Sequence, residues 1–135
     1  MKNVSIIFHS GSYDRVHHGL SIALSALLMG GKAKLYFTHA SLKYVKKGTK
    51  SSEKIVVEGD EHYAERYISN LKEGHIEELE EVIKYCKDVG AEIYVCPASM
   101  AMLNISRDEL IDEVDEVIGL SDFINRSKDF DLIFI

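Results

Sequence analysis

Apolar residues along this chain change repeatedly from short continuous runs to runs with helical spacing, a pattern that predicts alternating strands and helices. Residues 4–8 are apolar and β-branched without strict alternation, as in a central strand buried on both faces of a parallel sheet. Further apolar runs predict strands at 33–38, 93–95, 116–119 and 131–135. The pattern therefore predicts a five-stranded sheet.

The segments between these strands carry the helical pattern. After residues 4–8, apolar side chains recur at helical spacing, namely Val16, Leu20, Leu24, Leu27 and Leu28. Gly30 and Gly31 supply the left-handed stop of this helix, and Asp14 is its candidate N-cap. Helices are also predicted at 40–45, 60–71, 75–89, 98–103, 106–114 and 121–128, with a capping box at 106–109 and Ser121 as a cap.

Strands that alternate with helices predict a three-layer α/β/α sandwich with a mostly parallel five-stranded sheet. A length of 135 residues with 46% apolar content is typical of a single domain, 1–135, with a full hydrophobic core. The longest window without charged residues, 16–31, is too short and too polar to span a bilayer. Because no secretory signal pattern opens the sequence, we expect a cytoplasmic protein without membrane association.

The charge balance bears on the partners. A net charge of -6 argues against nucleic-acid binding, which requires a basic surface to neutralise phosphates. One local exception is a lysine cluster, formed by Lys43, Lys46, Lys47, Lys50 and Lys54. This cluster is either a solvated loop or a docking patch for an acidic partner. The small polar residues at 48–53 predict a mobile loop beside it.

The chain contains two cysteines, Cys86 and Cys96, whose spacing offers neither a disulfide framework nor a C-x2-C metal pair. Both are expected to be reduced thiols. Cys86 continues the apolar stripe of the predicted helix at 75–89, so we expect it in the core.

Cys96 stands where the apolar run at 93–95 stops and a helical pattern begins. Pro97 suits the first position of a helix, which places Cys96 at the N-cap. There the sulfur faces the backbone N–H groups of Ala98 and Ser99 and the positive end of the helix dipole, and both favour a thiolate. The alternative is an inert buried cysteine.

Histidines follow two of the other predicted strands. His9 and His39 each stand just beyond a strand, and the carboxyl ends of parallel strands share one edge of a sheet. Either histidine could stabilise a thiolate at Cys96 or shuttle its proton, or be a polar residue of a strand-end loop. His17 and His18 lack a partner at helical spacing, which argues against a metal site. The loop at 9–14 matches no phosphate-binding motif, and the sequence has no G-x-S-x-G elbow.

Taken together, these segments make the chain resemble the DsrE/DsrF-like family, which includes subunits of the DsrEFH and TusBCD sulfur-relay complexes. The resemblance rests on the opening strand with its Ser10-Gly11-Ser12 turn, the helix to Gly30-Gly31, the strand at 35–37, the Cys96 element at 93–103, and the segments 117–120 and 131–133. The stretch at 48–71 does not align with the family. The resemblance implies a five-stranded parallel sheet, homo-oligomers such as trimers or hexamers, and a persulfide carried on Cys96.

The resulting hypothesis is an intracellular sulfur carrier, or sulfurtransferase subunit, that receives sulfane sulfur from a donor protein and passes it to an acceptor protein. Cys96 is the catalytic residue, and His9, His39 and Ser99 are candidate modulators. The chemistry requires no metal and no organic cofactor. Two alternatives stay open: a non-catalytic oligomeric module that binds a small ligand or partner with Cys96 lining the site, and thiol redox catalysis at Cys96.

Overall fold

A single parallel sheet forms the centre of the molecule. The computed structural model describes residues 2–48, 50–51, 55–58 and 60–135. Its sheet has five strands in the order β4-β3-β2-β1-β5, and every neighbouring pair is parallel. The strands are β1 (Val4–Phe8), β2 (Ala33–Phe37), β3 (Glu92–Val95), β4 (Glu116–Val117) and β5 (Asp131–Phe134). The predicted fold class and its five strands are confirmed.

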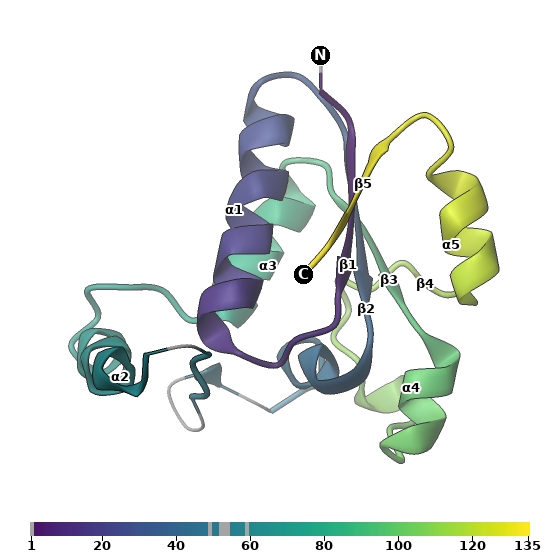
Figure 1. Ribbon diagram of the computed structural model, residues 1–135. Helices are drawn as coiled ribbons and strands as arrows, with labels where there is room; N and C mark the ends of the chain where they lie inside the picture. The colour runs from purple at the N-terminus through teal and green to yellow at the C-terminus, as the bar shows by residue number, and fades with distance from the viewer. Residues whose placement is uncertain (1, 49, 52–54, 59) are drawn as a thin grey trace.

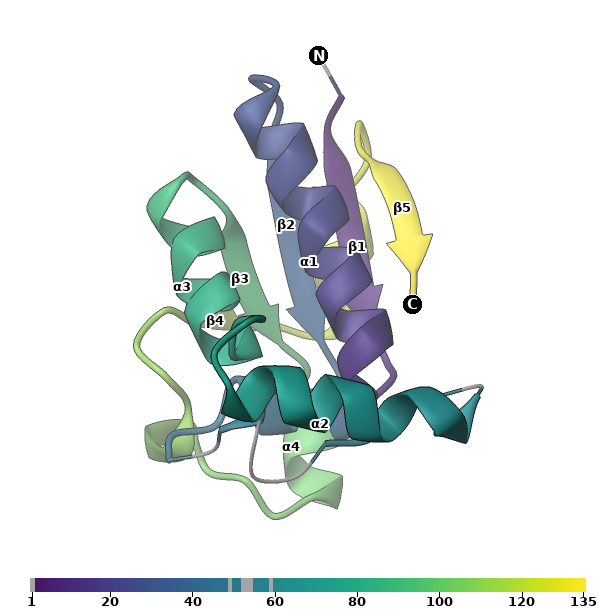
Figure 2. The same cartoon turned by 90° about the vertical axis from the view of Figure 1, so that its left-hand side faces the viewer.

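Helices cover both faces of this sheet (Figure 1). One face carries α1 (Tyr13–Leu28) and α3 (Leu79–Asp88), and the other carries α5 (Leu120–Arg126), with α4 (Pro97–Met102) at the end of β3. Figure 2 shows α2 (Ala64–Lys72) lying across the first turns of α1, outside these layers. Short 3-10 helices occur at η1 (His39–Tyr44), η3 (Glu61–Tyr63) and η4 (Arg107–Glu109).

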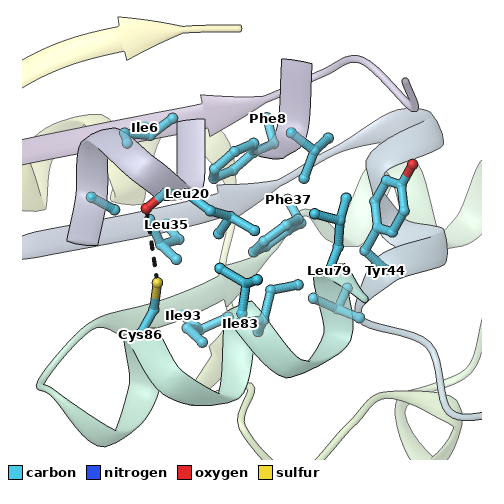
Figure 3. Close-up of a cluster of buried hydrophobic side chains, with 14 of the residues drawn as sticks. Ile6, Phe8, Leu20, Leu35, Phe37, Tyr44, Leu79, Ile83, Cys86 and Ile93 are labelled. Carbon is cyan, nitrogen blue, oxygen red and sulfur yellow. Dashed lines mark hydrogen bonds between the residues drawn. The ribbon is translucent and has the colours of Figure 1, made fainter. Parts of the chain in front are cut away.

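The larger core lies between the sheet and the pair α1 and α3 (Figure 3). Alternate strand residues point into it, and the rings of Phe8 and Phe37 stack there with centroids 4.7 Å apart. Cys86 is fully buried in this core, where its thiol lies 3.9 Å from the carbonyl oxygen of Leu20. Burial raises the pKa of Cys86 to about 11, so this thiol stays protonated at neutral pH. The prediction of Cys86 as a core residue is confirmed.

A smaller, aromatic core lies on the opposite face, beneath α5. Tyr36 and Tyr94, neighbours in the register of β2 and β3, both pack on Phe123. The Tyr36 ring stacks on Phe123 with centroids 4.6 Å apart, and Tyr94 meets Phe123 edge-on at 6.0 Å. Ile118 completes the cluster, and Cys96 packs against it. The reactive-thiol candidate therefore borders a core that contains phenol hydroxyls.

The predicted helix at 106–114 is wrong. The capping box between Ser106 and Glu109 forms, yet it closes only the 3-10 turn η4. The backbone at residues 109–111 then pairs with a segment distant in the sequence. Lys47 N–H donates to the Glu109 carbonyl at 2.8 Å, and Ile111 N–H donates to the Val45 carbonyl at 2.9 Å. These backbone hydrogen bonds are incompatible with the i→i−4 pattern of a continuing helix.

Several helix starts also differ from their predictions. The helix α3 begins at Leu79, whose N–H donates to the Ser51 hydroxyl at 2.9 Å, and not at residue 75. The N-cap of α1 is Ser12, which leaves Asp14 in the first turn. The N-cap of α5 is Gly119 in place of the predicted Ser121. The start of a helix depends on backbone conformation and on hydrogen-bond partners outside the helix, which apolar spacing does not record.

Candidate functional site

The carboxyl ends of β1, β2 and β3 bring the predicted site residues to one cavity. His9 follows β1, His39 follows β2 and Cys96 follows β3, and all of them line a cavity of about 430 Å³ together with Ser99. The two imidazole rings are neighbours, with centroids 4.7 Å apart. The structure thus gathers at one sheet edge the residues that the sequence places in three separate segments.

Backbone hydrogen bonds place Cys96 at the junction of β3 and α4. Its N–H donates to the Phe37 carbonyl at 3.0 Å, which continues the β2–β3 ladder, and its own carbonyl accepts from Met100 N–H at 3.1 Å. The backbone is extended at Cys96, and Pro97 occupies the first turn of the helix. Cys96 is therefore the N-cap, as predicted. Its side chain is partly buried, so the sulfur is reachable from the cavity.

The pKa of Cys96 results from opposing effects. Desolvation by partial burial raises the pKa, whereas hydrogen-bond donors around the sulfur lower it; the donors are the Tyr36 hydroxyl, the Ser99 backbone and hydroxyl, and the Ala98 backbone. The donors prevail, and the pKa of Cys96 lies below its ordinary value of 9.0. The Cys96 side chain forms no N-cap hydrogen bond in the structure. The groups named above therefore lower the pKa as donors near the sulfur and not through a formed cap. Burial shifts the pKa of Cys86 in the opposite direction, so the two thiols of the chain differ in acidity.

Ser99 joins α4 to the end of β2. Its side chain is 1% exposed, and its hydroxyl oxygen accepts the backbone N–H of His39 at 2.8 Å. His39 has a φ of 48°, in the left-handed region that residues other than glycine enter at a cost of roughly 1–2 kcal/mol. The Ser99 hydrogen bond therefore helps to hold His39 in a strained conformation beside Cys96, a pattern that recurs at functional sites.

The histidine rings form one wall of the cavity. His9 lies between His39 and Phe134, whose ring centroid is 5.5 Å away. Both histidines are exposed, which leaves their ring nitrogens accessible to a ligand in the cavity. An imidazole in this position can donate to an anionic sulfur or exchange a proton with it.

Apolar side chains form the rest of the cavity rim. The exposed fractions are 61% for Met102, 47% for both Leu120 and Ile124, and 69% for Phe134. Among the described residues that line the cavity, none is Asp, Glu, Lys or Arg. Exposed apolar side chains gathered around a concave site are typical of a ligand or protein interaction surface.

Tyr36 is the site residue that the sequence did not reveal. It is fully buried and lines the same cavity as Cys96. Within the apolar strand at 35–37 its ring fits a core role, and only the register between β2 and β3 shows that its hydroxyl reaches the Cys96 side of the sheet. The weak signal in the sequence is a hydroxyl-bearing ring in the otherwise apolar run at 35–37.

The start of α1 has an internal anion in place of a phosphate site. The Glu58 carboxylate accepts the Ser10 hydroxyl at 2.7 Å and pairs with Arg15. Tyr13 N–H, at the first turn, donates to the Val56 carbonyl at 2.6 Å. Residues 55–58 thus fill the position at which a nucleotide phosphate would approach the helix.

The remaining candidates stay outside the cavity. His17 stacks on Tyr13 with centroids 5.7 Å apart, and the described residues contain no cluster of three His, Cys, Asp or Glu side chains that could hold a metal. In the lysine cluster, Lys46 lies 3.5 Å from the Glu109 carboxylate, whereas Lys54 and part of the adjoining loop at 48–53 lie outside the described residues. None of the helices in the described ranges has the length and apolarity needed to cross a bilayer.

The fold and the site define a class: an open parallel α/β domain with a cysteine at a helix N-cap position, at the carboxyl edge of its sheet. The model of the DsrE/DsrF-like family matches residues 2–134, and the chain belongs to this family.

Solved structures show the same fold. One is a protein of unknown function, MTH1491, from Methanobacterium thermoautotrophicum, with a TM-score of 0.68 and 11% identity, and 100% of each chain is covered. Another is the ychN protein from E. coli, with a TM-score of 0.61 and 12% identity, again with 100% of each chain covered. At these identities the likeness concerns the fold alone. No curated protein matches the sequence.

Proposed function

We propose that this protein is an intracellular sulfur carrier that holds sulfane sulfur as a persulfide on Cys96 and passes it to a partner protein. The observation that supports this proposal most is the position of Cys96: a partly buried thiol with a lowered pKa, at a helix N-cap, open to a cavity whose described lining contains no Asp, Glu, Lys or Arg. Membership of the DsrE/DsrF-like family agrees with a role in sulfur relay.

The chemistry needs one reactive thiolate. The Cys96 thiolate attacks the outer sulfur of a donor persulfide R–S–SH; an S–S bond to Cys96 forms, the S–S bond of the donor breaks, and the donor leaves as R–SH. An acceptor thiolate then attacks the outer sulfur of the Cys96 persulfide, which returns Cys96 to its thiolate. Cys86 is buried in the other core and cannot discharge the persulfide by forming a disulfide.

Partners fit the rim of the cavity. Donor and acceptor proteins must bring a sulfur to Cys96, and the exposed apolar side chains of α4, α5 and β5 offer them, or further copies of this chain in a trimer or hexamer, a contact surface. A reduced Cys96 requires a reducing compartment, which agrees with a cytoplasmic location.

Intact mass spectrometry tests the proposal. The reduced protein is incubated with thiosulfate, polysulfide or a persulfide-loaded donor, for wild type, Cys96→Ser and Cys86→Ala. We expect wild type and Cys86→Ala to gain the mass of one sulfur atom and Cys96→Ser to gain none. Loading of Cys96→Ser, or no loading of wild type by any donor, would contradict the carrier role.

The same experiment addresses the alternatives. In a non-catalytic binding module, Cys96 would alkylate as a thiol whose pKa is not lowered and would not load. In a redox catalyst, Cys96 would form a sulfenic acid or mixed disulfide with no retained sulfane sulfur. The lowered pKa of Cys96 favours a reactive thiol over the first alternative.

A further inference from the structure

The hydroxyl of Tyr36 has a backbone carbonyl as its acceptor and lies on the side of the sheet where Cys96 lines the cavity. The ring is fully buried and stacked on Phe123, and the hydroxyl donates to the carbonyl of Ile118 at 2.9 Å. Ile118 follows β4, and its N–H donates to the Val95 carbonyl at 3.1 Å, one residue before Cys96. The phenol thus reaches from β2 across the end of β3, on the sheet face where Cys96 lies and into the cavity that Cys96 lines.

We propose that the Tyr36 hydroxyl is a hydrogen-bond donor to the reacting sulfur of Cys96, and that it exchanges acceptors during the sulfur-transfer cycle. It donates to the Ile118 carbonyl while Cys96 is a neutral thiol, and turns to the sulfur of Cys96 when that sulfur is anionic. The part of this inference that concerns the persulfide rests on the proposed function. The part that concerns the thiolate does not.

The exchange needs only a rotation about the phenol C–O bond. The Tyr36 ring stays stacked on Phe123, and the phenol O–H bond stays intact. The hydroxyl donates its one proton to whichever acceptor is more negative. A hydrogen bond to a charged acceptor is stronger than one to a carbonyl, by roughly a factor of two, so thiolate formation decides the direction. Burial, and then the neighbouring Cys96, raise the pKa of Tyr36 above its ordinary value of 10.0, so the phenol keeps its proton.

Few other ionisable side chains line the cavity. From β1 and β2 the titratable groups are His9, His39 and Tyr36, and from α4 and α5 the described lining residues are uncharged. Tyr36→Phe leaves the other ionisable lining residues, His9 and His39, in place, so the wild type and the variant differ at the cavity by one hydroxyl. During loading, the proton of the donor persulfide leaves with R–SH, and Tyr36 keeps its own.

The chain offers a matched control in Tyr94. Tyr94 is 3% exposed, packs on the same Phe123 ring from the same sheet face, and its hydroxyl donates to Glu92 at 3.1 Å, away from Cys96. Tyr36→Phe and Tyr94→Phe each remove one buried hydroxyl from the same aromatic cluster. Only Tyr36→Phe removes a donor to the sulfur.

The test is the rate of alkylation of Cys96 by iodoacetamide as a function of pH, in a Cys86→Ala background. Tyr36→Phe should move the profile to higher pH and slow alkylation about three- to tenfold on its acid side, because a hydrogen bond to a charged group is lost. Tyr94→Phe should leave the profile in place. An unmoved profile in Tyr36→Phe, or equal shifts in both variants, overturns the inference.

Sulfur loading separates this inference from the proposed function. If Tyr36→Phe shifts the profile while wild type loads no sulfur, the carrier role fails and the Tyr36 donor to the thiolate stands. If Tyr36→Phe fails to fold, the infrared C–O stretching band of ring-labelled tyrosine in Tyr94→Phe is compared on the two sides of the Cys96 titration. A band shift that disappears with Cys96→Ser supports the exchange of acceptors, and a band that does not move overturns it.

Discussion

Ser99→Ala removes a hydroxyl that has two roles at the site. The hydroxyl accepts the N–H of His39 at 2.8 Å, and it is one of the groups that lower the pKa of Cys96. The substitution leaves the His39 N–H without its partner at a backbone position with a φ of 48°. We therefore expect a loss of stability and a loss of thiol reactivity from one change.

The expected losses of stability and of thiol reactivity follow from the partial burial of the His39 N–H and of the Cys96 sulfur. An unsatisfied donor costs about 1–3 kcal/mol, and the lower half of that range applies to a part-buried N–H, so Tm should fall by roughly 3–8 °C. Thiolate stabilisation by one donor, discounted for the exposure of the sulfur, should slow alkylation of Cys96 below neutral pH by about three- to tenfold.

The assay pairs thermal unfolding with iodoacetamide alkylation across pH. Ser127→Ala is the matched control: this hydroxyl, at the C-cap of α5, is also buried, and it donates to the Phe123 carbonyl at 2.8 Å. The control should lose some stability and no reactivity. A Ser99→Ala protein with a lower Tm and an unchanged alkylation profile would refute the electrostatic role of Ser99 and leave it a purely structural one.

Other predictions concern separate parts of the molecule. Cys86→Ala should lower the free energy of unfolding by about 1–2 kcal/mol through the lost sulfur and the cavity it leaves, without changing sulfur loading; slower loading would link this core to the site. Leu120→Lys places a cation at the rim of a cavity whose described lining has no Lys or Arg, and should speed loading by dianionic thiosulfate about threefold relative to an uncharged donor. Leu132→Lys, at a residue that is 49% exposed and outside the cavity lining, should not have this effect; equal effects would show that net charge alone matters. Burial raises the pKa of the Glu80 carboxyl above 4.5, so the native state binds this proton more tightly than the unfolded state does, and stability falls as pH rises from about 4.5 through the native pKa. Glu80→Gln should therefore flatten this part of the pH dependence of Tm. An unchanged slope would assign the pH dependence to other groups.

The sheet was predictable because buried strands leave a strong local signal. The apolar runs gave all five strands, and Cys96 followed by Pro97 gave the N-cap of α4 correctly. The helix expected from the capping box at Ser106 failed because Glu109 and Ile111 form backbone hydrogen bonds with residues 45–47, far away in the sequence. A local motif cannot report such a competitor.

The part of the site that was predictable from the sequence is the part that follows from the order and direction of the strands. Placing His9, His39 and Cys96 at strand ends was enough to bring them to one edge, because parallel strands share their carboxyl edge. Tyr36 was missed since its contribution depends on which neighbouring strand its hydroxyl crosses. The Ser99 contact with the His39 N–H likewise depends on how α4 packs against the end of β2.

The central claim is that Cys96 carries a transferable sulfur atom. Its most direct test is to load the protein with isotopically labelled sulfane sulfur, map the label by peptide mass spectrometry, and then add an acceptor thiol. We expect the label on the peptide that contains Cys96, no label in Cys96→Ser, and the subsequent appearance of the label on the acceptor as a persulfide. Label that never resides on Cys96, or that leaves only as free sulfide with a mixed disulfide at Cys96, would contradict this claim.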